Sequence, residues 1–272
     1  MIRNHLIITL FSLSFFLFGC QPKKDTAEQE KKQQIGENIN YETAQKKRIQ
    51  QFPDSVLLVE DLLQWYRTNN RYNEAIQMTD SLISSNEKNK IYHHILGILY
   101  YEINDTANAI KQFENAISFS PQISDWLSLG SLYAGKKDPR SFDIAFEIEK
   151  KDPPKYTKEA CFIRGTFYES MGDFKRAISS FDSCIQIEFS FMEAYREKAI
   201  CLIELNKYRD AIKVLERAIT LNNRFAEGYY WMGVCYEKTN QTDLAIASYQ
   251  KAFLYDNTYT EAEDALKRLN EK

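Results

Sequence analysis

The stretch that decides the fold runs from Ala226 to Tyr259 and reads AEGYYWMGVCYEKTNQTDLAIASYQKAFLYDNTY. Its first half spaces apolar residues and one glycine at i, i+3, i+4 and i+7, one face of an α-helix: Tyr229, Met232, Gly233 and Tyr236. Its second half repeats this with Ala245, Tyr249, Ala252 and Phe253. The segment between them, 238–243, holds no apolar residue. The stretch therefore predicts two helices joined by a short turn.

The same pattern recurs at a fixed distance along the chain. Thirty-four residues before Gly233 stands Ala199, and 34 residues before that stands Gly165. The aromatic Tyr236 corresponds in the same way to Leu202 and Tyr168. A constant period with small and large residues in a fixed order indicates an array of repeats, each one supersecondary unit.

The pattern resembles the tetratricopeptide repeat, whose motif has a small residue at position 8, aromatics at 11 and 24, and Ala at 20 and 27. About six copies follow one another, over 56–89, 90–122, 123–157, 158–191, 192–225 and 226–259. Position 8 holds Leu63, Gly97, Gly130, Gly165, Ala199 and Gly233. Position 20 holds Ala75, Ala109, Phe142, Ala177, Ala211 and Ala245. The resemblance covers about three quarters of the chain.

This resemblance implies an all-α fold, a right-handed superhelix of about six helix-turn-helix repeats. Small residues at positions 8 and 20 let the two helices of a repeat touch, and stacking of neighbours completes the core. Segments 41–55 and 260–272 are expected to be capping helices at the two ends. The turn between the helices is expected to use a left-handed residue, for which Asn and Gly are suited. These turn residues are Asn70, Asn104, Asp138, Gly172, Asn206 and Asn240.

The third repeat departs from the pattern in its second helix. Phe142 stands where Ala is expected, and Glu149 stands where a small residue is expected. Asp138 and Pro139 read as an N-cap followed by a first-turn proline. Two interpretations remain open: a degenerate repeat with a slightly altered pitch, or a hinge between two halves of three repeats each.

The N-terminus has the form of a targeting segment. Residues 1–19 contain one positive charge, Arg3, before a short apolar run over 6–18, which predicts a cleaved signal peptide. The residues Leu17-Phe18-Gly19-Cys20 resemble the lipobox of bacterial lipoproteins. That resemblance implies cleavage before Cys20 and lipidation of Cys20, so that the protein is held on a membrane. The alternative is an ordinary secretory signal with a chance cysteine.

Residues 20–40 are polar and charged and cannot bury enough apolar surface to fold alone, so we expect a lipidated flexible tether. The resemblance implies a bacterial cell-envelope location, and Gln21 after the cysteine favours the outer membrane, facing the periplasm. Exposure at the cell surface is the alternative, because Lys23, Lys24 and Asp25 loosely resemble surface-export signals of some Bacteroidetes lipoproteins.

Charge and reactive residues point away from nucleic acid and from catalysis. The 272-residue chain has a formal net charge of −3 with both signs mixed along it, which argues against nucleic acid as a partner. His93 and His94 are adjacent, so they point about 100° apart on a helix and cannot share one metal ion. The four cysteines after Cys20 form no zinc or C-x-x-C spacing. We expect no enzyme activity, no cofactor and no metal.

What remains is the groove that the first helices line in proteins of this family. The positions that line it there correspond to mixed apolar and acidic residues here: Ile98, Tyr101, Glu102, Glu159, Phe162, Glu169, Arg196, Ile200, Glu204, Glu227, Tyr230, Val234 and Glu237. The Lys/Asn clamp with which some such domains hold a C-terminal carboxylate is absent, since Arg196 and Ile200 occupy two of its places. This set, the peptide groove, predicts a partner segment with apolar and basic residues.

The function that these features predict is a membrane-anchored adaptor or scaffold that binds envelope proteins through the peptide groove. A glycan- or nutrient-binding lipoprotein is the alternative, and exposed tryptophans on the groove would favour it. An enzyme or an enzyme accessory subunit is the third class. The sequence leaves the partner and the oligomeric state open.

Overall fold

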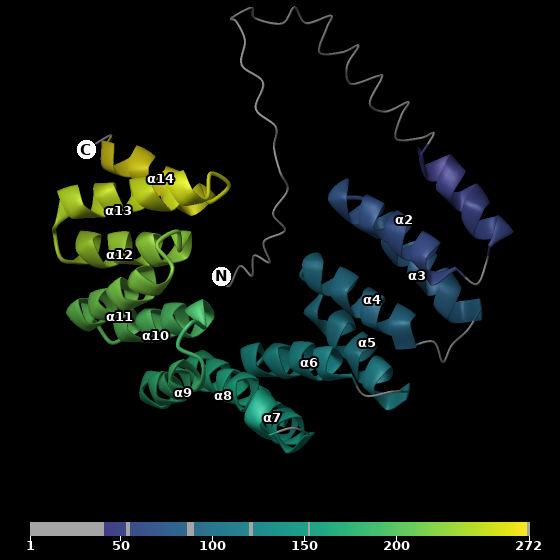
Figure 1. Cartoon of the computed structure of the whole chain (residues 1–272), viewed down its shortest axis with the longest axis horizontal. Coiled ribbons are helices and arrows are strands. Elements are labelled where there is room, and N and C mark those ends of the chain that lie inside the picture. The colour runs from purple at the N-terminus through teal and green to yellow at the C-terminus, as the bar shows by residue number, and fades with distance from the viewer. Residues whose placement is uncertain (1–40, 53–54, 86–89, 120–121, 152, 271–272) are drawn as a thin grey trace, which may run out of the picture. The chain divides into compact units, whose positions relative to one another are not determined.

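The computed structural model describes residues 41–52, 55–85, 90–119, 122–151 and 153–270. Within these ranges every regular element is a helix and there is no strand, which confirms the predicted all-α fold (Figure 1). The predicted signal peptide 1–19, the tether 20–40 and its Cys20 lie outside the described residues.

The described residues divide into two compact units, one within 1–71 and the other within 72–272. The division falls inside the predicted first repeat, between its two helices. In the first unit a helix over 41–51 precedes α2 (Val56–Thr68). Glu42 joins the two, because its carboxylate accepts hydrogen bonds from Tyr66 at 2.8 Å and from Arg71 at 2.6 Å. Tyr41 also packs on Trp65, with ring centroids 5.3 Å apart.

The second unit is a succession of antiparallel helix pairs. Its helices are α3 (Tyr72–Ser85), α4 (Lys90–Glu102), α5 (Thr106–Phe119), α6 (Ile123–Gly135), α7 (Arg140–Lys151), α8 (Pro153–Ser170), α9 (Phe174–Ile187), α10 (Met192–Glu204), α11 (Tyr208–Leu221), α12 (Ala226–Lys238), α13 (Thr242–Tyr255) and α14 (Thr260–Asn270). Each helix packs on the next in the chain, and first helices of successive repeats also touch, as α10 touches α12.

Glycine at position 8 lets the helices of a pair approach closely. A Cβ atom added to Gly165 would lie 2.6 Å from the ring of Phe181, and one added to Gly233 would lie 2.6 Å from the ring of Tyr249. In each pair the aromatic at position 24 lies against the glycine. The predicted packing of small against aromatic residues is confirmed in these repeats.

The left-handed turn residues follow the prediction except in the third repeat. Asn70, Asn104, Asn206 and Asn240 have φ between 57° and 62°, and Gly172 has φ of 77°. The prediction for Asp138 is wrong, because Lys137 takes this conformation with φ of 62°. The left-handed residue is the fifteenth residue of a repeat. Lys137 is the fifteenth residue of the repeat that begins at 123, as Asn104 is of the repeat that begins at 90.

The second helix of the third repeat is turned by one residue relative to its equivalents. The N–H of Ala109 donates to the carbonyl of Asp105, four residues back, whereas the N–H of the equivalent Phe142 donates to Pro139, three residues back. This tighter first turn places Ser141 where the other repeats bury Ala. The buried residues of α7 are Ser141, Ile144, Ala145 and Ile148.

The expectation that Phe142 and Glu149 occupy the small-residue places is therefore corrected. Phe142 instead packs against Phe167 and Tyr168 of α8, with ring centroids 4.9 and 5.5 Å apart. The aromatic at position 24, Phe146, is 62% exposed. Helices α6, α7 and α8 pack on one another within the second unit, so the altered repeat is a rotated helix inside a continuous array.

Replacing Gly165 by Ala tests the close helix approach. The new methyl group would meet the Phe181 ring at 2.6 Å, so we expect a loss of about 1–3 kcal/mol in the free energy of unfolding. Urea titration measures this loss. Gly135→Ala is the matched control, because nothing lies within 4 Å of its added Cβ. Equal stability of the two variants would show that α8 and α9 do not depend on the glycine.

Candidate functional site

Ion pairs and hydrogen bonds tie the first helices of successive repeats together at a constant spacing. His94 of α4 lies 2.5 Å from Asp125 of α6, and the two are 31 residues apart. Arg196 of α10 donates to Glu227 of α12 at 2.6 Å, again across 31 residues. The first helices of successive repeats are parallel and displaced along their axes by about one turn. The offset is therefore the 34-residue period less about one helical turn.

The peptide groove ends in a hollow that α12, α13 and α14 form together. Its volume is about 1000 Å³. Three predicted groove residues line it: Tyr230, Val234 and Glu237. The structure thus brings the C-terminal members of the predicted set into one cavity.

Helix α14, which was expected to be only a capping helix, also supplies residues to the hollow. Glu261, Asp264 and Arg268 all line the hollow. The signal that could have found them is the repeat period, since they stand 34 residues after Glu227, Tyr230 and Val234 respectively. Helix α14 therefore acts as the first helix of one more repeat.

Tyr230 is the central aromatic side chain of this hollow. It is half-buried, and its ring lies 5.6 Å from Tyr249 and 5.1 Å from Tyr259, centroid to centroid. Burial raises the pKa of its hydroxyl, so it stays neutral and can donate a hydrogen bond. A ring held on two sides, with one edge in a cavity, is suited to pack against an apolar side chain of a partner.

Two groove carboxylates are already neutralised within the protein. Glu237 accepts hydrogen bonds from Tyr249 at 3.1 Å and from Arg268 at 2.8 Å. Glu227 pairs with Arg196, which also donates to Glu197 at 2.7 Å. Burial lowers the pKa of Arg196, but Glu197 and Glu227 outweigh that effect and raise it, so the guanidinium stays charged.

Glu169 lies on α8, the first helix of the repeat before that of Arg196. The charge state of its carboxyl group differs from that of Glu227 and Glu237. No side chain among the described residues makes a hydrogen bond or an ion pair with its carboxyl group. Burial, with repulsion from Glu197, raises its pKa to about 8, although Arg196 acts against this. Glu204 adds to the repulsion. Glu169 therefore holds a proton at neutral pH, and a cation placed beside it would release that proton.

The remaining predicted groove residues divide between surface and core. Phe162 packs between Phe181 and Phe191, with centroids 5.5 and 5.2 Å apart, and Ile98 packs against a core cluster. Tyr101 is 36% exposed. Glu102, Glu159 and Ile200 are half-buried, and Glu204 is exposed. The hollow and Glu169 are thus the parts of the peptide groove with the most distinctive chemistry.

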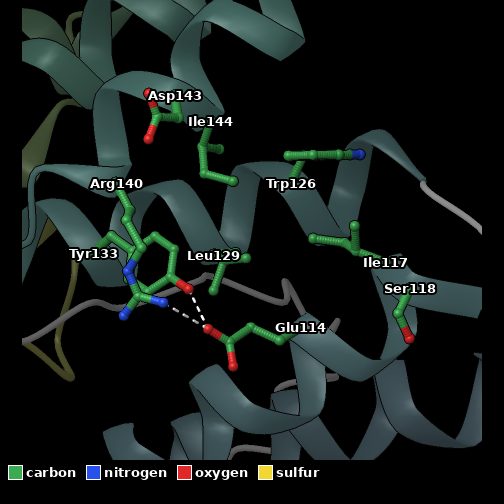
Figure 2. A pocket seen from close by; sticks show the side chains of 9 residues that line it. All are labelled: Glu114, Ile117, Ser118, Trp126, Leu129, Tyr133, Arg140, Asp143 and Ile144. Carbon is green, nitrogen blue, oxygen red and sulfur yellow. Dashed lines mark hydrogen bonds and ion pairs between the residues drawn. The ribbon is translucent and has the colours of Figure 1, made fainter.

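A second, smaller cavity lies at the third repeat and was not predicted from the sequence. Its volume is about 280 Å³, and Ile117, Trp126, Leu129 and Ile144 give it an apolar wall. Figure 2 shows Glu114 accepting hydrogen bonds from Tyr133 and from Arg140, whose guanidinium lies 4.2 Å from the Tyr133 ring centroid. The rotation of α7 explains the cavity, because Ile144 is smaller than the aromatic that packs on position 8 elsewhere.

Residues capable of metal or membrane chemistry are not gathered in the described part of the chain. His93 contacts Gln112 at 2.8 Å while His94 contacts Asp125, so the two histidines face different partners. Among the described residues no three His, Cys, Asp or Glu side chains are placed to hold a metal ion. No helix there has the length and apolar character to cross a bilayer. All three tryptophans are half-buried.

Replacing Glu169 by Gln should change how stability depends on pH. The folded pKa of about 8 lies above the unfolded value of 4.5, so the folded chain binds the proton more tightly and wild-type stability falls as pH rises between them. Glu169→Gln removes this loss, and we expect a gain on the order of 1 kcal/mol at pH 8.5 and none at pH 4. Thermal unfolding at both pH values measures it. A gain of equal size at both would contradict the raised pKa.

Comparison with known proteins agrees with this geometry. A family model described as a tetratricopeptide repeat matches residues 92–123, 158–191 and 226–259, and a second, described as a TPR repeat, matches 202–240. These segments include most of the predicted second repeat and all of the fourth and sixth. No curated protein matches the chain significantly.

Similar solved structures share the architecture at low sequence identity. A tetratricopeptide repeat protein from Parabacteroides merdae is 18% identical, with 88% of this chain and 94% of that chain covered and a TM-score of 0.71. A TPR protein from Thermus thermophilus is 15% identical over 67% of this chain and all of its own, with a TM-score of 0.56.

Yeast Tom70 is 19% identical over 83% of this chain and 48% of its own, with a TM-score of 0.63.

Repeat arrays of this kind present extended surfaces to other proteins, so the fold indicates a protein–protein interaction scaffold. The helix pairs over 92–123, 158–191 and 226–259 match the tetratricopeptide repeat model.

Proposed function

We propose that this protein is a membrane-anchored adaptor of the bacterial cell envelope. Its tetratricopeptide repeats bind a segment of a partner protein in the peptide groove, and lipidated Cys20 holds the array at the outer membrane, facing the periplasm. The observation that carries the proposal is the hollow of about 1000 Å³ at the end of the groove, where an aromatic ring and several carboxylates meet.

The lining of the hollow supports a partner segment with both apolar and basic residues. Tyr230, Val234 and Leu269 offer apolar contact, while Glu261 and Asp264 place negative charge at the same cavity. Arg268, which Glu237 binds, and Lys238 also line the cavity, so its carboxylates exceed its cations by one charge. Charge of one sign in a concave site attracts a ligand of the opposite sign and steers its approach.

Glu169 adds a reason for a cationic residue in the segment. The carboxyl group is protonated at neutral pH because no cation balances it, in keeping with its pKa of about 8. A Lys or Arg side chain from a partner, set beside Glu169, would favour the ionised form and gain a charge-assisted hydrogen bond. A basic side chain of the partner would thus supply the positive charge beside the carboxyl group of Glu169.

The N-terminal sequence supports the membrane anchor. An apolar run of 13 residues over 6–18 is too short to span a bilayer, which takes about 20, and it ends at the lipobox-like Leu17-Phe18-Gly19-Cys20. Two or more acyl chains on one residue give stable membrane attachment. A polar tether over 21–40 then separates the lipid from the array.

Photocrosslinking in cells tests the groove. With a photoreactive amino acid at Tyr230, we expect a discrete crosslinked envelope protein, and a drop of at least about tenfold in yield when Asp264 is changed to Lys, which repels a basic segment. The matched control is Glu216→Lys, the same change in charge on the outer helix α11, which should leave the yield unchanged. The same crosslinker at Leu254, 74% exposed on α13, reports nonspecific capture. Equal capture at Leu254, or no effect of Asp264→Lys, would refute the groove.

Replacing Cys20 by Ser tests the anchor. We expect the wild type to incorporate labelled palmitate and to remain in the membrane fraction after a carbonate wash, because its acyl chains insert into the bilayer. The Cys20→Ser variant should incorporate no label and leave the membrane. Cys201→Ser controls for loss of a cysteine as such. A variant that stays in the membrane fraction would show that Cys20 is not the anchor.

A further inference from the structure

Two cysteines that the proposed function does not use face each other inside one repeat. Cys161 is half-buried on α8, and Cys184 is fully buried on α9. They stand at positions 4 and 27 of the repeat 158–191. The next two repeats hold a large and a small residue there, Tyr195 with Ala218 and Tyr229 with Ala252.

The contact between the two thiols follows from the packing of α8 on α9. Cys161 packs against the core cluster that contains Cys184. The Sγ of Cys184 also lies 3.4 Å from the carbonyl oxygen of Lys158, which is one helical turn before Cys161. Cys184 is therefore level with the second turn of α8, on the face that carries Cys161.

The close approach of the two helices reinforces this placement. Gly165 lies one turn after Cys161, and a Cβ atom added to it would meet the Phe181 ring at 2.6 Å. The helices therefore run closer together here than two ordinary side chains would permit. A disulfide needs Cα atoms within about 7 Å of each other, and such pairs occur only where backbones approach closely.

We propose that Cys161 and Cys184 are a redox-active pair that forms a reversible disulfide between α8 and α9. The oxidant is a disulfide-bonded thiol compound, of which oxidised glutathione is the simplest. The Cys161 thiolate attacks one sulfur of that disulfide, which forms a mixed disulfide and releases one thiol. Cys184 then loses its proton and displaces the second thiol, which closes the Cys161–Cys184 bond. Two electrons pass to the small disulfide, and two thiols leave.

The surroundings assign Cys161 as the attacking residue. The neighbouring Cys184 thiol and the guanidinium of Arg164, whose Nη2 is 3.6 Å from the sulfur, lower the pKa of Cys161 to about 6, although burial opposes them. Glu149 holds Arg164 in place at 3.3 Å and slightly counteracts its effect. A thiol that is partly exposed and ionised near neutral pH is the reactive kind.

The other two cysteines in the array lack these features. Cys201 and Cys235 are fully buried, and burial raises the pKa of Cys235 to about 12. Burial and the carboxylates of Glu169, Glu197 and Glu204 likewise raise the pKa of Cys201. Both should remain as inert thiols while Cys161 reacts.

Equilibration of the purified full chain with mixtures of reduced and oxidised glutathione tests the proposal. After acid quenching and alkylation, trypsin cuts after Arg164 and Arg176, so the two cysteines fall in different peptides. We expect a Cys161–Cys184 crosslinked peptide that grows with the oxidised fraction and disappears on reduction. We also expect the oxidised chain to melt several degrees higher than the reduced chain, because the bond closes a loop in the unfolded state.

Cys184→Ala is the matched variant, because Ala116, Ala218 and Ala252 stand at the same position of other repeats and show that it can pack there. This variant should keep its fold, lose the crosslinked peptide and lose the shift in melting temperature. Cys201→Ala should keep both. The proposal is overturned if Cys161 stays reduced at every ratio, stops at the mixed disulfide with glutathione, or pairs with another cysteine.

Discussion

The contact on which the second unit depends is a glycine on one helix lying against an aromatic ring on its partner. Gly165 meets Phe181, and Gly233 meets Tyr249, at distances that leave no room for a Cβ atom. Because the glycine adds no side chain, the ring covers the helix backbone directly and both are removed from water. This contact fixes the distance between the helices of these pairs, whereas Ala199 and Leu215 take the two places in the fifth repeat. Stacking then extends the core from one pair to the next, since no single pair can bury its own apolar face.

The same geometry sets the chemistry of the surface. Parallel first helices displaced by one turn bring residue i beside residue i+31, and the chain uses this offset for Arg196 with Glu227 and for Glu237 with Arg268. Pairs of this kind neutralise most of the buried charge at the groove. Glu169 has no such ion pair among the described residues. Burial and repulsion from Glu197 raise the pKa of its carboxyl group, and no cationic side chain of those residues is bound to it. The groove therefore combines satisfied ion pairs, which keep the helices in register, with one carboxyl group that holds a proton instead of a partner.

The third repeat shows how a tightened first turn changes the packing of a whole helix. A three-residue hydrogen bond at Phe142 turns α7 by one position, so that Phe146 points outward and the smaller Ile144 packs inward. The hydroxyl group of Ser141 is buried without a hydrogen-bond partner, and a cavity of about 280 Å³ opens beside Ile144. A local change in backbone hydrogen bonding thus alters the surface of the array while the stacking of its helices continues.

Periodicity was sufficient to predict the helix pairs, the small and aromatic contacts and five of the six turn residues, because each depends on residues a fixed distance apart in one chain. The rotation of α7 was not predictable in this way, since it depends on whether a first turn closes over three residues or four. The contribution of α14 to the groove follows the same 34-residue period, whereas the protonated state of Glu169 and the contact between Cys161 and Cys184 arise between helices. They depend on burial and on distances across the packed pairs, which a linear pattern of residue types does not contain.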